Sequence, residues 1–138
     1  MKNDEILLNE IYENSITAIN VISGLLRKTN NQSMFDCLFE EMTEYRKIAD
    51  SAYNLLEKSP SIYKVLPYSQ IAVLASVGKP SCHRIARILI SGSTEGFYSL
   101  IDSVNACTNT KDEVRQLAYR LMEIEDKNIN VMKRFLKN

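Results

Sequence analysis

The residues with the clearest chemical potential are Cys82 and His83, which are adjacent and follow Pro80 and Ser81. The start of a helix lowers the pKa of a thiol, and a neighbouring imidazole assists its deprotonation. Cys37 is the third residue that could join them at one end of a helical bundle. Two thiols and one imidazole are one ligand short of a closed zinc site. These residues are therefore candidates for a metal or redox site, although small core side chains are the simpler interpretation of the cysteines.

The acidic residues could form a second kind of metal site. A di-iron bundle needs a Glu from each of two helices and Glu-x-x-His from each of the other two. The chain contains one histidine, His83, and its acidic pairs are Glu41-x-x-Glu44 and Glu123-x-x-Asp126. Because neither pair contains His, the sequence excludes a di-iron site of that kind.

Polar residues fall in the middle of the apolar stripes that the sequence predicts, namely Ser15, Tyr45, Ser93 and Asn128. A polar atom buried without a partner costs about 1 to 3 kcal/mol, so we expect a hydrogen-bonded cluster that fixes the helix register. The same cluster could line a small cavity. Three carboxylates flank it, and we expect them on solvated faces because unpaired acids are rarely buried: Glu41, Glu44 and Glu125.

A short run of small residues, Gly92-Ser93-Thr94-Glu95-Gly96, contains the remaining candidate ligand, Glu95. A stretch with so little side-chain volume allows another helix to approach closely. We therefore expect Gly92 and Gly96 to mark intramolecular helix packing, and we include Glu95 among degenerate carboxylates for a metal.

Composition excludes several function classes. The 138 residues are 45% hydrophobic and 25% charged, typical of one globular domain. The 17 basic and 17 acidic residues cancel, which argues against nucleic-acid and membrane partners. The longest apolar run, at 71–77, is far below the ~20 residues of a membrane span, and we expect no signal peptide because the residues from Met1 to Glu5 do not have the pattern of one. We expect a cytoplasmic protein with reduced thiols.

Apolar residues spaced by three and four predict four long helices, at 4–28, 33–58, 82–107 and 111–136. The second has the most regular stripe, which consists of Phe35, Leu38, Met42, Tyr45, Ala49, Ala52 and Leu56. A short helix is predicted at 68–77, with Pro67 at its start and Gly78 past its end. The predicted N-terminal caps are Asn3 or Asp4, Ser33 with Asp36, Ser81, and Thr110 with Glu113.

These elements predict a single all-α domain, an antiparallel four-helix bundle. Short connections after the first helix and before the last make neighbours antiparallel. The long central connection favours a ferritin-like crossover between the second and third long helices, with an up-down-up-down bundle as the alternative. Cys37 would share an end of the bundle with Cys82 in the crossover, and with Cys107 in the alternative.

Four segments carry a resemblance to a known group: Leu7 to Asn14, Lys79 to Ala86, Ile90 to Thr94 and Glu123 to Ile129. In these segments the chain resembles small uncharacterised ferritin-like four-helix-bundle proteins of anaerobic Gram-positive bacteria. The resemblance implies a bundle with a long central connection, and it implies no reaction.

No phosphate-binding loop, nucleophile elbow or Cys-x-x-Cys pair occurs in the sequence. We therefore expect a non-enzymatic bundle without catalytic residues or cofactor, which acts by protein–protein interaction or self-association. Candidate contact residues are Tyr12, Tyr53, Tyr63 and Tyr68, together with the short helix. The alternative is a metal-binding or redox protein that uses Cys37, Cys82 and His83, or the carboxylates with Glu95. A third hypothesis, a binder of a small apolar ligand between the helices, requires a cavity.

Overall fold

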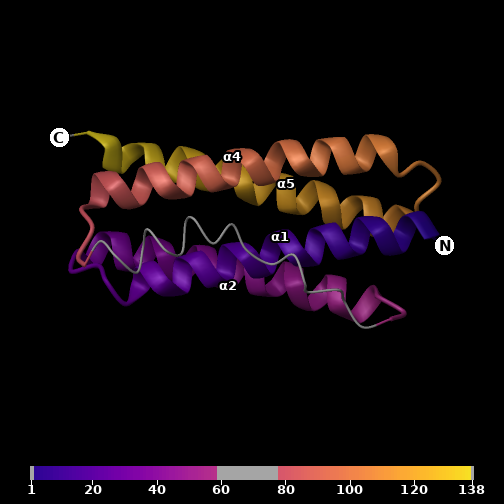
Figure 1. The fold of residues 1–138 in the computed structure, drawn as a ribbon, viewed down its shortest axis with the longest axis horizontal. Coiled ribbons are helices and arrows are strands. Elements are labelled where there is room, and N and C mark those ends of the chain that lie inside the picture. The colour runs from indigo at the N-terminus through magenta and orange to yellow at the C-terminus, as the bar shows by residue number, and fades with distance from the viewer. Residues whose placement is uncertain (1, 59–77, 138) are drawn as a thin grey trace.

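The computed structural model describes residues 2–58 and 78–137, which form four long α-helices (Figure 1). They are α1 (Lys2–Leu26), α2 (Gln32–Leu55), α4 (Cys82–Ala106) and α5 (Asp112–Lys133), and α5 continues into a 3₁₀ turn, η1 (Arg134–Leu136). The prediction of an all-α protein with four long helices is confirmed. The short helix predicted at 68–77 lies outside the described residues.

Asn31 organises the turn between α1 and α2. It is the N-cap of α2, and its side-chain oxygen accepts a hydrogen bond from the backbone N–H of Met34 at 2.9 Å. The hydroxyl of Thr29 accepts a hydrogen bond from the backbone N–H of Asn31. The capping box predicted at Ser33 is therefore wrong, because the helix already begins at Gln32.

Ser81 caps α4 as predicted, since its hydroxyl accepts a hydrogen bond from the backbone N–H of Arg84 at 3.1 Å. At the other end of α4, the chain turns through Asn109, whose φ of 62° lies in the left-handed region that Asn tolerates better than most residues. This short turn brings α5 back alongside α4.

A residue of α1 forms a hydrogen bond with the backbone at the start of α5. The N-cap position of α5 is Lys111, which makes no side-chain cap, and the hydroxyl of Thr110 accepts from Arg115 instead. The carboxylate of Asp4 accepts a hydrogen bond from the backbone N–H of Lys111 at 2.9 Å. The predicted cap at Thr110 and the predicted role of Asp4 as cap of its own helix are therefore both wrong. Asn3, also inside α1, donates to the backbone oxygen of Thr108.

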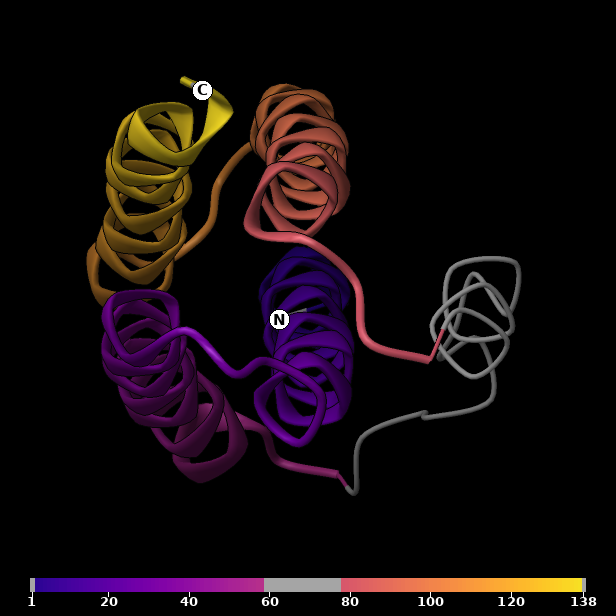
Figure 2. The ribbon, with the colours of Figure 1, turned by 90° about the vertical axis from the view of Figure 1, so that its left-hand side faces the viewer.

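The four helices lie at the corners of a square when seen along the bundle (Figure 2). Each of α1 and α5 contacts α2 on one side and α4 on the other. Both sequential pairs, α1 with α2 and α4 with α5, are antiparallel (Figure 1). Figure 1 also shows that α2 and α4 run in the same direction, so that both begin at the same end of the bundle. Cys37 and Cys82 therefore lie toward one end and Cys107 toward the other.

The core runs between the helices and is built mainly from aliphatic side chains. Its largest fully buried members are Leu7, Leu8, Ile11, Ile22, Leu25, Met34, Leu38, Ile48, Ile85, Leu100 and Leu121, together with Tyr45. Burying one such side chain contributes roughly 1.5 to 3 kcal/mol, so this core is the main source of stability. Among the described residues, no helix is both long and apolar enough to cross a membrane.

Candidate functional site

Two acidic residues lie in the core, contrary to prediction. Glu41 in α2 and Glu125 in α5 are each 4% exposed, although both were expected on solvated faces. The buried residues of α2 include Met34, Leu38, Glu41, Tyr45, Ile48 and Ala52, and those of α5 include Val114, Ala118, Leu121, Glu125, Asn128 and Met132. Steps of three and four residues alternate along both sets. Each glutamate thus occupies a core position near the middle of its helix.

A cavity of about 280 Å³ lies beside these two carboxyl groups. Residues of α1 between Glu13 and Ile22 form one wall, and residues of α4 between Ile88 and Ser99 form the other. Side chains from the remaining two helices, those of Glu41, Tyr45 and Glu125, complete the lining. All four helices therefore contribute to the site.

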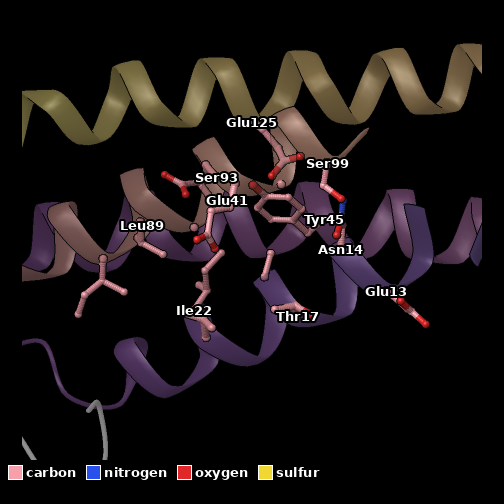
Figure 3. A pocket seen from close by; sticks show the side chains of 16 residues that line it. Glu13, Asn14, Thr17, Ile22, Glu41, Tyr45, Leu89, Ser93, Ser99 and Glu125 are labelled. Carbon is pink, nitrogen blue, oxygen red and sulfur yellow. The ribbon is translucent and has the colours of Figure 1, made fainter. Parts of the chain in front are cut away.

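The cavity is not uniform along its length. In Figure 3, the aliphatic side chains of Ile22 and Leu89 lie toward one end, while the polar side chains of Asn14 and Ser99 lie toward the other. The carboxyl groups of Glu41 and Glu125 lie between them (Figure 3). The site therefore offers an apolar region next to acidic groups.

The small residues of α4 make room for this arrangement. A Cβ atom at Gly92 would meet no other atom within 4 Å, so this glycine borders open space in the cavity. A Cβ atom at Gly96 would overlap Oε2 of Glu125 and would lie 3.1 Å from its Cδ. The predicted close intramolecular packing is thus confirmed at Gly96, where a carboxyl group of α5 packs against α4, and is wrong at Gly92, which borders a space.

Tyr45 lies between the two acids. Figure 3 shows its ring between the carboxyl groups of Glu41 and Glu125, and its side chain is 2% exposed. Burial raises the pKa of the phenol above its ordinary value, and the carboxylates of Glu125 and Glu41 add to the rise, while the nearby side chains of Ser93 and Asn128 oppose it. Neither polar side-chain atom of Asn128 has a hydrogen-bond partner. Of the predicted polar cluster, the structure thus brings Tyr45, Ser93 and Asn128 together. Ser15 is buried as well, with no hydrogen-bond partner for its hydroxyl.

Burial changes the acidity of both carboxyl groups. The pKa of Glu125 rises from 4.5 to about 8 because its carboxyl group is removed from water. Burial also raises the pKa of Glu41 to about 8, with a further contribution from Glu44 and an opposing one from Lys127. Oε2 of Glu41 and Oε1 of Glu125 have no hydrogen-bond partner. Two acids are therefore held in the core without the partners that normally stabilise them.

The charge of the lining has one sign. Four glutamates contribute to it, namely Glu13, Glu41, Glu95 and Glu125, and no Lys, Arg or His among the described residues does so. Lys127 lowers the pKa of Glu41 and forms an ion pair with Glu44 outside the cavity. The lining therefore favours a positively charged group over a negative one.

The residues predicted for a metal site do not gather at this cavity, with the exception of Glu95, whose side chain is exposed at its lining. Cys37 and Cys82 are partly buried and pack against the core, and His83 is exposed at the start of α4. Within residues 2–58 and 78–137, no three Cys, His, Asp or Glu side chains are grouped so that they could hold a metal ion.

Glu41 and Glu125 are the residues that sequence reasoning misplaced, and a signal for them existed. Leu38, Glu41 and Tyr45 follow the same three-and-four spacing as Leu121, Glu125 and Asn128. The predicted stripe of α2 runs instead through Met42 and Ala49, and every member of it is apolar or aromatic. Most members of both stripes are buried, since α2 packs against two helices, but Phe35 of the predicted stripe is 38% exposed.

Comparison with known proteins identifies no relative. No protein-family model matches the chain, and neither a curated protein nor a solved structure is significantly similar to it.

Proposed function

We propose that this protein is a non-enzymatic ferritin-like bundle that binds a small organic molecule in its central cavity. One observation carries the proposal: two carboxyl groups, each 4% exposed and each with an unpaired oxygen, line a cavity of about 280 Å³. Ligand sites in bundles commonly lie between the helices, and they combine apolar walls with a few polar groups.

The ferritin-like assignment rests on helix direction and on the origin of the carboxylates. A crossover bundle has its second and third long helices parallel, as α2 and α4 are (Figure 1). The buried acids come from α2 and α5, and Glu125 is followed three residues later by Asn128 where a di-iron bundle has His. We therefore propose a bundle of this type whose centre binds a ligand instead of two irons.

The energetics also favour a functional role for the acids. Unpaired buried polar groups cost about 1 to 3 kcal/mol each, and charged groups cost more. A Leu or Met at either position would fill the core without that cost. Features that lower stability without a structural benefit are expected at functional sites.

A cavity-blocking variant tests the proposal. Gly92→Leu places a side chain in the open space that Gly92 borders, and Ser91→Leu adds the same side chain at an exposed position of the same helix. We expect fragments of up to about a dozen heavy atoms to raise the Tm of the wild type and of Ser91→Leu, but not that of Gly92→Leu. Binding that Gly92→Leu leaves intact, or a screen in which no fragment binds the wild type, would refute the proposal.

A surface on α1 and α2 supports self-association as a second candidate function. The rings of Tyr12 and Tyr53 lie 6.1 Å apart, and Tyr53 is 55% exposed. Together with Ile16, Ile19 and Ala49 they line a groove of about 450 Å³. Light scattering over a range of concentrations tests this role, with Tyr53→Ser expected to reduce the mass of any assembly. A wild type that stays monomeric at high concentration would eliminate it. Tyr63 and Tyr68, the other predicted contact residues, lie outside the described residues.

A further inference from the structure

We infer that the ligand of the central cavity is a small organic cation, an alkyl or aralkyl primary amine, whose ammonium group is held by Glu41 and Glu125. This inference rests on the proposed function and names the chemical class of its ligand. Three features of the cavity lead to it: the sign of its charge, its unpaired acceptors and its apolar region.

Charge is the first feature. A cavity lined by four glutamates and by no described basic residue disfavours an anion. Breaking a buried ion pair by removing one partner is strongly destabilising, because one charge remains alone. Glu41 and Glu125 lack such a partner, so burial favours their neutral form, and a cationic ligand would stabilise the ionised form.

The unpaired acceptors are the second feature. Oε2 of Glu41 and Oε1 of Glu125 accept no hydrogen bond. An ammonium group carries three donors and no acceptor, so it suits a lining whose carboxyl oxygens are unpaired acceptors. Hydrogen bonds between an ammonium and a carboxylate are roughly twice as strong as neutral ones. A neutral alcohol offers one donor and no charge, so it can form only the weaker kind with a neutral carboxyl group.

The apolar region is the third feature, and it limits the size and polarity of the part of the ligand beyond the ammonium group. Next to the acids, the cavity is lined by Ala18, Val21, Ile22, Ile88 and Leu89. A dry engineered cavity of about 150 Å³ holds benzene, and this cavity is larger at about 280 Å³. A chain of about five carbons or one aromatic ring therefore fits beside the ammonium group.

Proton release should accompany binding. Both carboxyl groups have a pKa of about 8, so they hold protons at pH 7, and an ammonium group favours their ionised form. Glu40, Glu44 and Lys127 also act on Glu41. Tyr45 lies beside both acids, and Glu13 of α1 and Glu95 of α4 line the same cavity. Affinity for an amine should therefore rise between about pH 6 and pH 9, with protons released to the buffer.

The test uses three probes that share an n-pentyl tail: n-pentylamine, n-pentanol and n-hexanoate. A second series shares the benzyl group and consists of benzylamine, benzyl alcohol and phenylacetate. Calorimetry in two buffers of different ionisation enthalpy measures affinity and proton release together. At pH 8 we expect the better of the two amines to bind at least about tenfold more tightly than its alcohol, with no detectable binding of either anion.

The variants Glu41→Gln and Glu125→Gln keep the side-chain shape and remove the charge. Each should weaken amine binding at least about tenfold and change alcohol binding by less than about threefold. Glu123→Gln, at an exposed position of α5, should change neither. Thermal unfolding verifies that all three variants are folded.

Two outcomes would overturn the inference. If an alcohol or an anion binds as tightly as its amine, and Gly92→Leu abolishes that binding, the cavity is a ligand site for another class, and only the proposed function stands. If neither amine binds the wild type at concentrations up to about 10 mM, the assignment of an amine fails, whatever the fragment screen shows.

Discussion

The carboxyl group of Glu125 lies directly against Gly96 of the neighbouring helix, in the space that the Cβ atom of any larger residue would need. A glycine inside a helix normally costs about 0.5 to 1 kcal/mol relative to alanine. At this position the cost has a structural reason, because the space left by the missing side chain accommodates the buried carboxyl group of Glu125.

The effect of replacing Gly96 on the free energy of unfolding should therefore depend on Glu125. In the wild type, Gly96→Ala should lower the free energy of unfolding by about 1 kcal/mol, because the displaced carboxyl group outweighs the gain in helix propensity. In a Glu125→Ala background, the same change should raise it by about 0.5 to 1 kcal/mol. Urea unfolding of the four proteins measures both effects. The same sign in both backgrounds would contradict the contact. Gly92→Ala, which meets no atom, should stabilise both.

Stability should fall as the pH rises through the range in which the two buried acids differ from their unfolded forms. Below about pH 4.5 the carboxyl of Glu41 is protonated in both states. Between about 4.5 and 8 the unfolded chain releases a proton that the native protein retains, so unfolding becomes easier. Each acid contributes about 1 kcal/mol per pH unit to this fall.

Glu41→Gln should remove its share of that slope and make the protein more stable than the wild type at pH 8, with little difference near pH 4.5. Urea unfolding at several pH values measures this, and Glu123→Gln serves as the exposed control. A variant with the same pH profile as the wild type would show that Glu41 is not held protonated by burial.

The contact between Asp4 and the start of α5 should also be measurable. Asp4→Ala removes the acceptor for the backbone N–H of Lys111, and we expect a loss of about 1 kcal/mol in the free energy of unfolding. Asp4→Asn keeps an oxygen in place and should recover most of that loss. Faster hydrogen exchange at Lys111 in the Ala variant, but not in the Asn variant, would identify the bond. Asp102→Ala, at an exposed site of α4, should have little effect.

The thiols should react slowly in the folded protein. Burial raises the pKa of both Cys37 and Cys107 above 9.0, and nearby carboxylates add to the rise. Because the thiolate is the reactive form, both should react with iodoacetamide at pH 8 more slowly than they do in urea. Peptide mass spectrometry assigns the rates. Fast modification of Cys37 would instead support the redox alternative, for which elemental analysis of the purified protein is the companion measurement.

The sequence predicted the helices well because their stripes are long and regular. It placed Ser81 correctly as a cap, since Ser followed by a helical stripe is a local signal. It failed where the partner is distant in the sequence. The acceptor for Lys111 is Asp4, more than a hundred residues away, and no local pattern could reveal it.

The same limit of sequence-based prediction, that it misses partners distant in the sequence, applies more strongly to the candidate site. Tyr45 and Ser93 were placed correctly in the middle of the bundle, because they interrupt apolar stripes. Glu41 and Glu125 were assigned to the surface on the general rarity of buried acids. The burial of Glu125 depends on the space beside Gly96 on another helix, and both acids face a cavity that only the assembled bundle defines.

The position of the cavity also bears on how a ligand could enter. Short turns join α1 to α2 and α4 to α5, so each pair forms a helical hairpin, and the cavity lies where the two hairpins meet. A small sliding of one hairpin relative to the other would change the width of this boundary without breaking any hydrogen bond within a helix. A ligand of the proposed kind would therefore enter and leave between the hairpins and not through the body of either one.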